Sequence, residues 1–193
     1  MQAYDPLDYD NLARSVVDAL LGAEEQSLPP SDTFEGAGVY AIYYHGDFEG
    51  YYNLVKVDPL PPIYVGKAVP TGARKGRGRT AGRRELYQRL KQHSKSIVEA
   101  ENIQLEDFTC RYLVVVPVWV TLAERFLVEH YKPVWNVAID GFGNHDPGAG
   151  RRSMKRPRWD ILHPGRRWAA RLTADESFEL VLRSLRQFLE REF

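Results

Sequence analysis

One ordered series of motifs and polar residues restricts what this chain can fold into. The series is Gly38-Val39-Tyr40, Tyr64-Val65-Gly66, Arg89, His93, Glu124 and Asn136. Both tripeptides lie in segments rich in β-branched and aromatic residues, which favour strands. Arg89 and His93 are four residues apart in a segment with helical spacing, so they share one face of a helix. The series predicts an α+β fold, with two tyrosine-bearing strands ahead of two helices that carry polar side chains.

The remaining apolar residues predict how the series is connected. Strands are expected at residues 38–44, 62–67 and 108–116, and helices at residues 8–21, 83–99 and 174–192. Thr121 is expected to cap a further helix that ends before Pro133, which puts Glu124 at the third helical position of a capping box.

The composition limits the class of protein. A chain of 193 residues suits one domain with appendages. Cys110 is the only cysteine, so no intrachain disulfide can form and a reducing compartment is expected. The acidic stretch after Met1 argues against a signal peptide, and no apolar run approaches the roughly 20 residues of a spanning helix. We therefore expect a cytoplasmic protein with no membrane contact. The five histidines lack the spacing of a structural zinc site.

Charge is distributed unevenly, although the formal net charge is zero. Residues 67–95 contain ten Lys or Arg and one acid, and residues 151–171 contain eight Lys or Arg and one acid. The first 35 residues contain eight acids and one arginine. Two basic blocks and an acidic arm are typical of a protein that binds phosphates on one face. Solvated loops explain one such block equally well, so it is the pair of blocks beside the polar series that favours DNA.

The whole series resembles the GIY-YIG nuclease family over residues 36–137, with Val in place of Ile in both tyrosine motifs. This resemblance implies a small central three-stranded antiparallel sheet flanked by helices, with helical additions at both ends. On this interpretation residues 1–35 form an N-terminal helical arm and residues 36–137 form the catalytic core. Residues 138–193 supply a DNA-contacting loop and a C-terminal helix of the same domain.

Further motifs resemble the type II restriction endonucleases of that family. They are residues 62–70, Asp140-Gly141-Phe142-Gly143-Asn144-His145 and His163-Pro164-Gly165-Arg166, with a tail from Trp159-Asp160 to Trp168-Ala169. The likeness implies a homodimer that cuts both strands of a palindromic site in double-stranded DNA. It also implies a CCGCGG type of target and a cognate methyltransferase in the same system.

Hydrolysis of a phosphodiester gives three polar residues of the series a chemical role. Glu124 is expected to ligate Mg²⁺, or another divalent cation such as Mn²⁺, because Mg²⁺ often takes only one or two protein carboxylates. Arg89 would donate to the scissile phosphate, and His93 would pass a proton or hold a tyrosine hydroxyl. Each residue taken alone has a plainer interpretation. Glu124 would complete the capping box, and the other two would be solvated on a helix.

The resemblance to the family's restriction enzymes makes Tyr40 the expected general base toward water and Tyr64 the residue that positions water or phosphate. A phenol with a pKa of about 10 needs nearby cations for such a role, and Lys67, Arg89 and the metal are expected to supply them. Asn136 is expected to fix the loop after the second helix by hydrogen bonds. The alternative is that both tyrosines simply pack on strands and that Lys67 is solvated.

DNA contacts are expected from Lys67 and from the two loops at residues 74–84 and 141–152, because arginines reading guanine edges are the commonest specific contact. The residues assigned to DNA are Lys67, Arg74, Lys75, Arg77, Arg79, Arg83, Arg84, Asn144, His145, Arg151 and Arg152. Two other functions stay open. A structure-specific or repair nuclease of the same family would cut branched DNA, and a noncatalytic DNA-binding module would keep the fold without cleavage.

Overall fold

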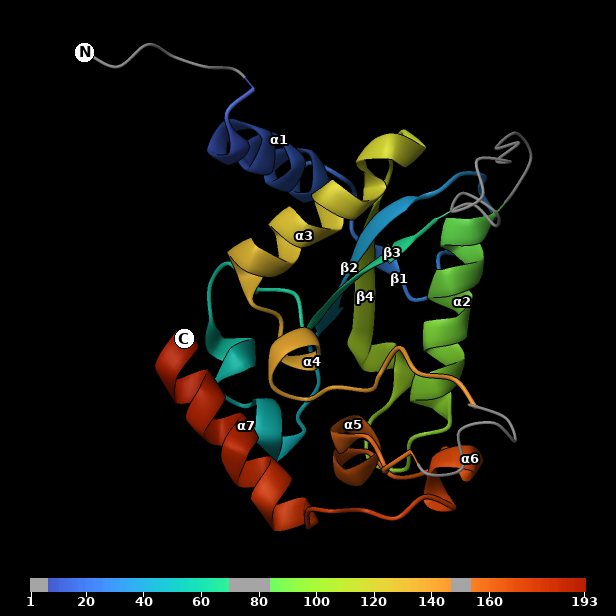
Figure 1. Ribbon diagram of the computed structural model, residues 1–193, viewed down its shortest axis with the longest axis vertical. Coiled ribbons are helices and arrows are strands. Elements are labelled where there is room, and N and C mark those ends of the chain that lie inside the picture. The colour runs from blue at the N-terminus through green and yellow to red at the C-terminus, as the bar shows by residue number, and fades with distance from the viewer. Residues whose placement is uncertain (1–6, 70–83, 147–153) are drawn as a thin grey trace.

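A four-stranded antiparallel sheet forms the centre of the computed structural model, which describes residues 7–69, 84–146 and 154–193 (Figure 1). The strands, in spatial order, are β1 (Gln26–Ser27), β4 (Phe108–Val114), β2 (Gly38–Tyr44) and β3 (Tyr64–Ala68). The predicted α+β class is confirmed, but the predicted sheet is one strand short. β1 was missed because its two residues, which pair with Cys110 and Thr109, are too few to carry a periodic pattern.

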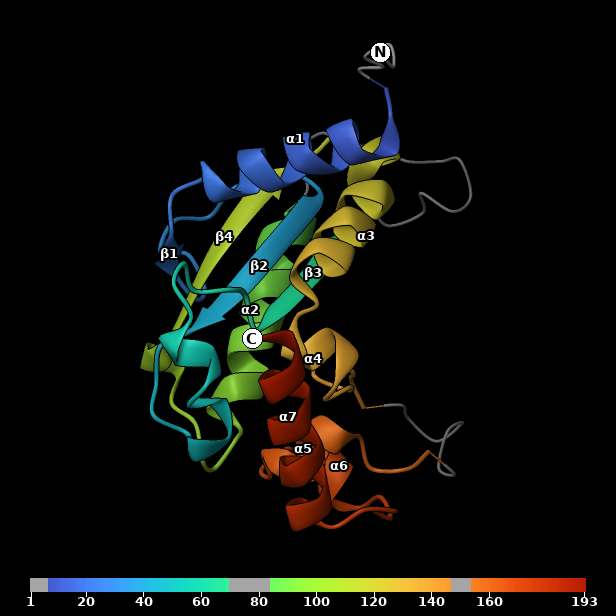
Figure 2. The same ribbon diagram turned by 90° about the vertical axis from the view of Figure 1, so that its left-hand side faces the viewer.

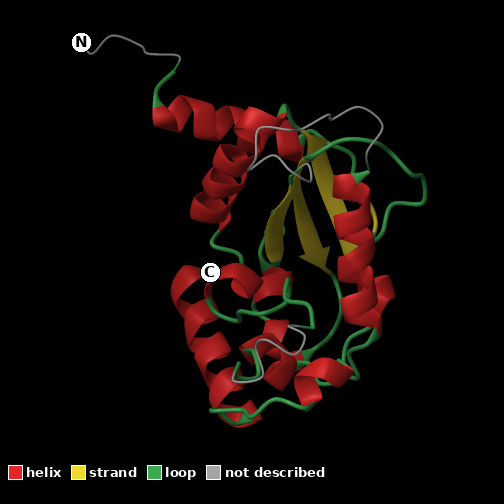
Figure 3. Cartoon of the chain, turned by 45° about the vertical axis from the view of Figure 1, so that its right-hand side comes forward, coloured by secondary structure: helices red, strands yellow, loops and turns green. Residues whose placement is uncertain are grey.

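The sheet separates two apolar cores, and β2 is buried on both faces. The residues of β2 on the two sides are Tyr40, Ile42 and Tyr44, and Val39, Ala41 and Tyr43. α2 (Glu85–Val98) covers the first side, and α1 (Tyr9–Leu21) and α3 (Val120–Tyr131) cover the second. Figure 3 shows the strands between α2 and the pair formed by α1 and α3. The tyrosine of the first motif therefore faces the helix that carries Arg89 and His93.

The long helices keep their predicted positions with shifted ends. α1 begins after Asp8, whose side chain caps it. α2 begins at Glu85, two residues later than expected, and Leu86, Leu90 and Ile97 on its inner face are fully buried. α7 (Phe178–Glu192) begins four residues later than expected because Ser177 is its cap, accepting a hydrogen bond from the backbone amide of Leu180.

The predicted capping box at the start of α3 is wrong. A 3₁₀ turn at Pro117–Trp119 runs directly into the helix at Val120, so Thr121 lies inside the first turn. Trp119 occupies the cap position and makes no side-chain cap bond. Val120 is fully buried against the sheet, and this apolar contact favours a helix start one residue before the threonine. Glu124 is left without a capping role.

Three short helices pack at the end of the sheet together with α7. They are α4 (Val134–Val137), α5 (Arg158–Leu162) and α6 (Arg167–Ala170). Figures 1 and 2 both place these four helices at the same end of the strands. Trp135 and Trp159 meet edge to face in this region, with 5.6 Å between their ring centroids. No helix in the described part of the chain has the length and apolar character needed to cross a membrane.

Candidate active site

Two tyrosines on neighbouring strands form the centre of the predicted site. Tyr40 on β2 lies opposite Gly66 on β3, and 6.1 Å separates the centroids of the Tyr40 and Tyr64 rings. Gly66 permits this arrangement, because a Cβ there would lie 2.3 Å from the Tyr40 hydroxyl oxygen. Gly38 permits a close backbone approach, since its Cβ would lie 2.0 Å from the carbonyl oxygen of Leu113. Close packing thus explains the glycine of each tripeptide.

A Gly66→Ala variant should be destabilised by about 1–3 kcal/mol, the usual effect of an overpacked core. The Tyr40 ring cannot move aside, since it is fully buried and its hydroxyl is bound by His93. Urea unfolding followed by circular dichroism gives the free energy of unfolding. Gly22→Ala is the control, because Gly22 has helical backbone angles at the end of α1, and this change should shift stability by less than about 0.5 kcal/mol. Parental stability of Gly66→Ala would contradict the packing described here.

His93, on α2, binds the hydroxyl of Tyr40. The distance between Nε2 and the hydroxyl oxygen is 2.6 Å, and both side chains are almost fully buried. Burial, and after it the charge of Arg89, holds the pKa of His93 well below its usual range. The neutral imidazole therefore accepts the hydrogen bond that Tyr40 donates. The interpretation of His93 as a solvated helix residue is wrong.

The Tyr40 phenol is not made more acidic by the charges around it. Burial raises the pKa of Tyr40 well above its ordinary value, Tyr64 adds to the rise, and Arg89 opposes it only in part. Lys67, which was expected to help, binds Glu124 instead, with 2.5 Å between Nζ and Oε2. Tyr40 is therefore protonated at neutral pH in the free protein.

The guanidinium of Arg89 is held by a loop that follows α4. Nη1 donates to Nε2 of His145 at 2.7 Å and, within α2, to Oε1 of Gln92 at 3.3 Å. Nη2 donates to the carbonyl oxygen of Gly143 at 3.1 Å. A Cβ on Gly143 would lie 3.0 Å from both Nη2 and the hydroxyl oxygen of Tyr64, so a glycine lets the loop approach both groups. Arg89 is thus fixed by tertiary contacts rather than free on the helix surface.

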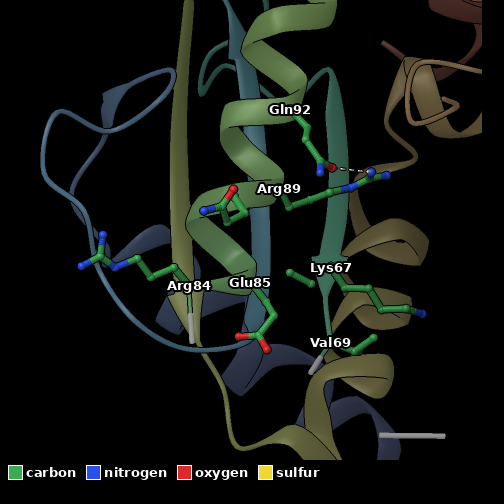
Figure 4. Close-up of a pocket in the computed structure, with 8 residues that line it drawn as sticks. Lys67, Val69, Arg84, Glu85, Arg89 and Gln92 are labelled. Atoms are coloured by element: carbon green, nitrogen blue, oxygen red, sulfur yellow. Dashed lines mark hydrogen bonds between the residues drawn. The ribbon is translucent and has the colours of Figure 1, made fainter. Parts of the chain in front are cut away.

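An open cleft of about 480 Å³ lies between β3 and α2 beside these residues. Figure 4 shows Lys67 and Arg89 extending from β3 and α2 toward the same side of it. Arg84, which was predicted to contact DNA, also lines the cleft, but its guanidinium points away from the other two. Glu85 is the one acid among the lining residues of the described chain. The cleft is therefore basic, as phosphate binding requires.

Glu124 lies on α3 and reaches the cleft through its ion pair with Lys67. Within residues 7–69, 84–146 and 154–193, no group of three or more His, Cys, Asp or Glu side chains could hold a metal. A single carboxylate beside an open cleft fits Mg²⁺, which keeps several waters and takes phosphate oxygens from its substrate. Lys67 binds one oxygen of this carboxylate, Oε2, beside the place where such a cation would be held.

Asn136, on α4, binds the backbone of β3 at Val65, the middle residue of the second tyrosine motif. Its side-chain oxygen accepts from the amide of Val65, and its side-chain nitrogen donates to the Val65 carbonyl, both at 2.8 Å. This pair of bonds ties α4 to the strand that carries Tyr64 and Gly66. The contacts agree with the expected architectural role of Asn136.

The loop at residues 141–145 contributes two site residues, Phe142 and Gly143, to which the sequence assigned no role. The Phe142 ring stacks on His93, with 4.5 Å between centroids and 19° between planes. The sequence marked this loop by its likeness to restriction enzymes and assigned it to DNA contact. It gave no sign of the contacts with Arg89, because these link residues more than 50 positions apart.

Most of the residues assigned to DNA lie outside the described part of the chain. These are Arg74, Lys75, Arg77, Arg79, Arg83, Arg151 and Arg152. His145 is engaged with Arg89, and Asn144 supplies backbone contacts, donating to the Gly141 carbonyl and accepting from Arg166. The assignments of Asn144 and His145 to DNA stay predictions.

The second basic block is largely structural in the part that is described. Six of its Lys and Arg residues lie between positions 155 and 171, and five of these bind carboxylates or backbone carbonyls. The five are Lys155, Arg156, Arg158, Arg166 and Arg171. Arg158 and Arg166 both form two-point contacts with an acid, Glu176 and Asp160. The count of charges along the sequence therefore overestimated how many of these side chains are available to bind phosphate. Most of their acidic partners lie outside residues 151–171, and Asp160 is the one acid inside that range.

The antiparallel tyrosine strands, the Arg89–His93 helix and the carboxylate on α3 together define a GIY-YIG nuclease. The model of the Eco29kI GIY-YIG domain matches residues 32–189. The chain belongs to this family, which is a family of type II restriction endonucleases, so it is a restriction-type nuclease that binds DNA. A comparison with curated proteins gave no significant match.

Proposed function

We propose that the protein is a type II site-specific deoxyribonuclease that hydrolyses phosphodiester bonds at a palindromic site in double-stranded DNA. The observation that carries this proposal is the convergence of the buried Tyr40–His93 pair with Arg89, which lines a basic cleft. Tyr40 and His93 share a hydrogen bond along which a proton can move, and Arg89 can bind a phosphate. Membership of a restriction endonuclease family supports the same conclusion.

Tyr40 is assigned as the general base, with His93 as the second proton acceptor. The attacking water gives a proton to the Tyr40 oxygen while the phenolic proton passes to Nε2 of His93 along their hydrogen bond, in which 2.6 Å separates oxygen from nitrogen. The water oxygen forms a bond to phosphorus as the bond to the leaving oxygen breaks, and the leaving oxygen takes a proton from a solvent water. A divalent cation, Mg²⁺ or Mn²⁺, held by Glu124 would stabilise charge on the phosphate and lower the pKa of water bound to it.

Other residues hold the phosphate and the strands in place. Arg89 would donate to the phosphate oxygens as charge builds there, and its fixed guanidinium suits that task. Tyr64 would position water or phosphate next to Tyr40, while Lys67 would move from Glu124 to a phosphate. Asn136 keeps β3 attached to α4 and acts through architecture.

Digestion of a plasmid of known sequence, with and without Mg²⁺, tests the proposed function. Discrete fragments are expected from the parent with Mg²⁺, and Glu124→Gln should give none, because the neutral amide is a poor ligand for a hard cation. Glu129→Gln is the matched control on the same helix, where Glu129 is exposed and pairs with Arg125. It should cut like the parent. Cleavage of branched DNA alone would favour a structure-specific nuclease, and binding without any cleavage would favour a noncatalytic module.

The family also supports proposals about partners and target. We propose a homodimer, because cutting both strands of a palindrome needs two equivalent sites, and a cognate methyltransferase that protects the host. Analytical ultracentrifugation of the protein bound to a duplex that contains its target site gives the mass of the complex and so tests the dimer. Sequencing of the fragment ends tests the CCGCGG type of target, which stays a prediction.

A further inference from the structure

A buried arginine lies outside the catalytic series. Arg166 precedes α6, and its side chain is 1% exposed. Its guanidinium donates to both carboxylate oxygens of Asp160, at 2.6 and 2.5 Å. It also lies over the rings of Trp159 and Trp168, 4.5 and 4.9 Å from their centroids. An arginine placed so deeply is held in one conformation.

The remaining donors of Arg166 all reach the loop at residues 141–145. Nη1 donates to the carbonyl oxygens of Phe142 and Asn144, each at 3.1 Å, and Nη2 donates to that of Gly141 at 3.0 Å. With the two bonds to Asp160, all five N–H groups of the guanidinium are used. One side chain therefore fixes three carbonyls within four consecutive residues of this loop.

The opposite side of the same loop contacts the proposed catalytic groups. Gly143 and His145 bind the guanidinium of Arg89, at 3.1 and 2.7 Å. Phe142, whose carbonyl Arg166 holds, stacks its ring on His93. The loop thus contacts the buried Arg166 and the cleft residue Arg89 at the same time.

We propose that Arg166, held by Asp160, is a positioning residue for phosphodiester cleavage, which acts by fixing the loop at residues 141–145 so that Arg89 is held at the cleft. This inference rests on the proposed function. It also gives a role to the His163–Arg166 and Asp140–His145 motifs, which the catalytic series leaves unexplained. A displacement of about 1 Å in a group that orients the substrate can reduce a rate by about 100-fold, so the shape of this loop bears directly on catalysis.

Arg166→Lys tests the proposal. Lysine keeps the charge beside Asp160, but one ammonium with three donors cannot serve both carboxylate oxygens and three carbonyls. We expect kcat to fall about 10–100-fold while KM for a duplex changes less than about threefold. The matched control is Arg158→Lys. Arg158 also makes a two-point contact with an acid, Glu176, and donates to a carbonyl, that of Ala138, but it does not contact the loop. Arg158→Lys should lose less thermal stability, since the Arg158 side chain is 30% exposed, and should keep the parental kcat.

A readout that needs no cleavage follows the Arg89 guanidinium by ¹⁵N NMR, with its signals assigned by their loss in Arg89→Lys. Hydrogen bonds to Gly143 and His145 restrict rotation of the guanidinium, so the parent and Arg158→Lys should show separate Nη signals. Arg166→Lys should show averaged ones. If Arg166→Lys does not fold, Asp160→Asn takes its place. This change keeps Arg166 and removes the charge of the carboxylate that binds it, and its Arg89 signals and kcat are compared with those of the parent.

The two readouts separate this proposal from the proposed function. Unchanged Arg89 signals in the Arg166 or Asp160 variant would overturn the positioning role, as would an equal loss of kcat in Arg158→Lys. A parent that cuts no DNA, with the Arg89 signals changed as expected, would overturn the proposed function and leave the Arg166–Arg89 link standing.

Discussion

Tyr40→Phe should bind duplex DNA like the parent protein and cleave it about 10²–10⁴-fold more slowly, the range expected for loss of a general base. Phenylalanine keeps the ring that packs between Gly66 and α2, so the fold should persist. The buried Nε2 of His93 loses its partner, which should lower the free energy of unfolding by about 1–3 kcal/mol. Single-turnover cleavage with excess enzyme measures the chemical step apart from product release.

Tyr44→Phe is the matched control for this change. Tyr44 lies two residues further along β2 on the same face, is equally buried, and uses its hydroxyl to accept a hydrogen bond from the amide of Phe48. Its loss should therefore reduce stability but not the cleavage rate. Retention of the parental single-turnover rate by Tyr40→Phe would remove this tyrosine from the chemistry and leave its hydroxyl a structural group.

Acid should destabilise the protein well before its carboxylates are fully protonated, because His163 is buried in its neutral form. Tyr51 receives a hydrogen bond from Trp135 and donates to Nε2 of His163, while Nδ1 donates to Asn102. Burial lowers the pKa of His163 to about 3. In the unfolded chain its pKa is near 6.5, so between these values the unfolded state binds the proton and the folded state does not. Stability is therefore complete above about pH 6.5 and falls as pH decreases.

The expected loss from His163 alone is about 3 kcal/mol at pH 4.5, two units below its unfolded pKa, and it approaches about 5 kcal/mol near pH 3. This is a large part of the 5–15 kcal/mol by which domains are usually stable. The depressed pKa of His93 acts in the same direction. Urea unfolding at pH 7 and at pH 4.5 measures the difference.

Two variants isolate the contribution of His163. His163→Gln removes the titrating group and should flatten the dependence of stability on pH, whatever its effect at pH 7. His130→Gln removes an exposed imidazole at the end of α3 and should leave the slope as in the parent. If parent and His163→Gln lose equal stability between pH 7 and 4.5, the buried imidazole is not the origin of the acid sensitivity.

Local patterns in the sequence predicted the elements that carry the site. The bounds of β2 were predicted to the residue, because its run of β-branched and aromatic residues is bounded by glycine and by a polar turn. The inward face of α2 followed from helical periodicity, and a hydrogen bond to a tyrosine hydroxyl was one of the two roles expected of His93. These features depend on contacts within one element or on a recognisable series.

Contacts between distant segments could not be predicted in the same way. Thr121 and Glu124 have the spacing of a capping box, yet the burial of Val120 moves the helix start and Lys67 binds the carboxylate. The basic residues after position 155 looked available for phosphates until their partners, such as Glu176, were seen in the fold. A sequence pattern records the charge of a side chain but not what lies opposite it.

The position of the Arg89-binding loop in the sequence determines when, during translation, the proposed nuclease site can be complete. Tyr40, Arg89 and Glu124 are all translated before the segment between residues 141 and 166, and α7 packs in afterwards against the turn at Glu49–Tyr51. A chain still attached to the ribosome can contain every residue of the proposed chemistry before Gly143 and His145, which bind Arg89, have been added. If the proposed roles hold, the late part of the polypeptide completes the site, and we expect a half-made chain to cut DNA poorly.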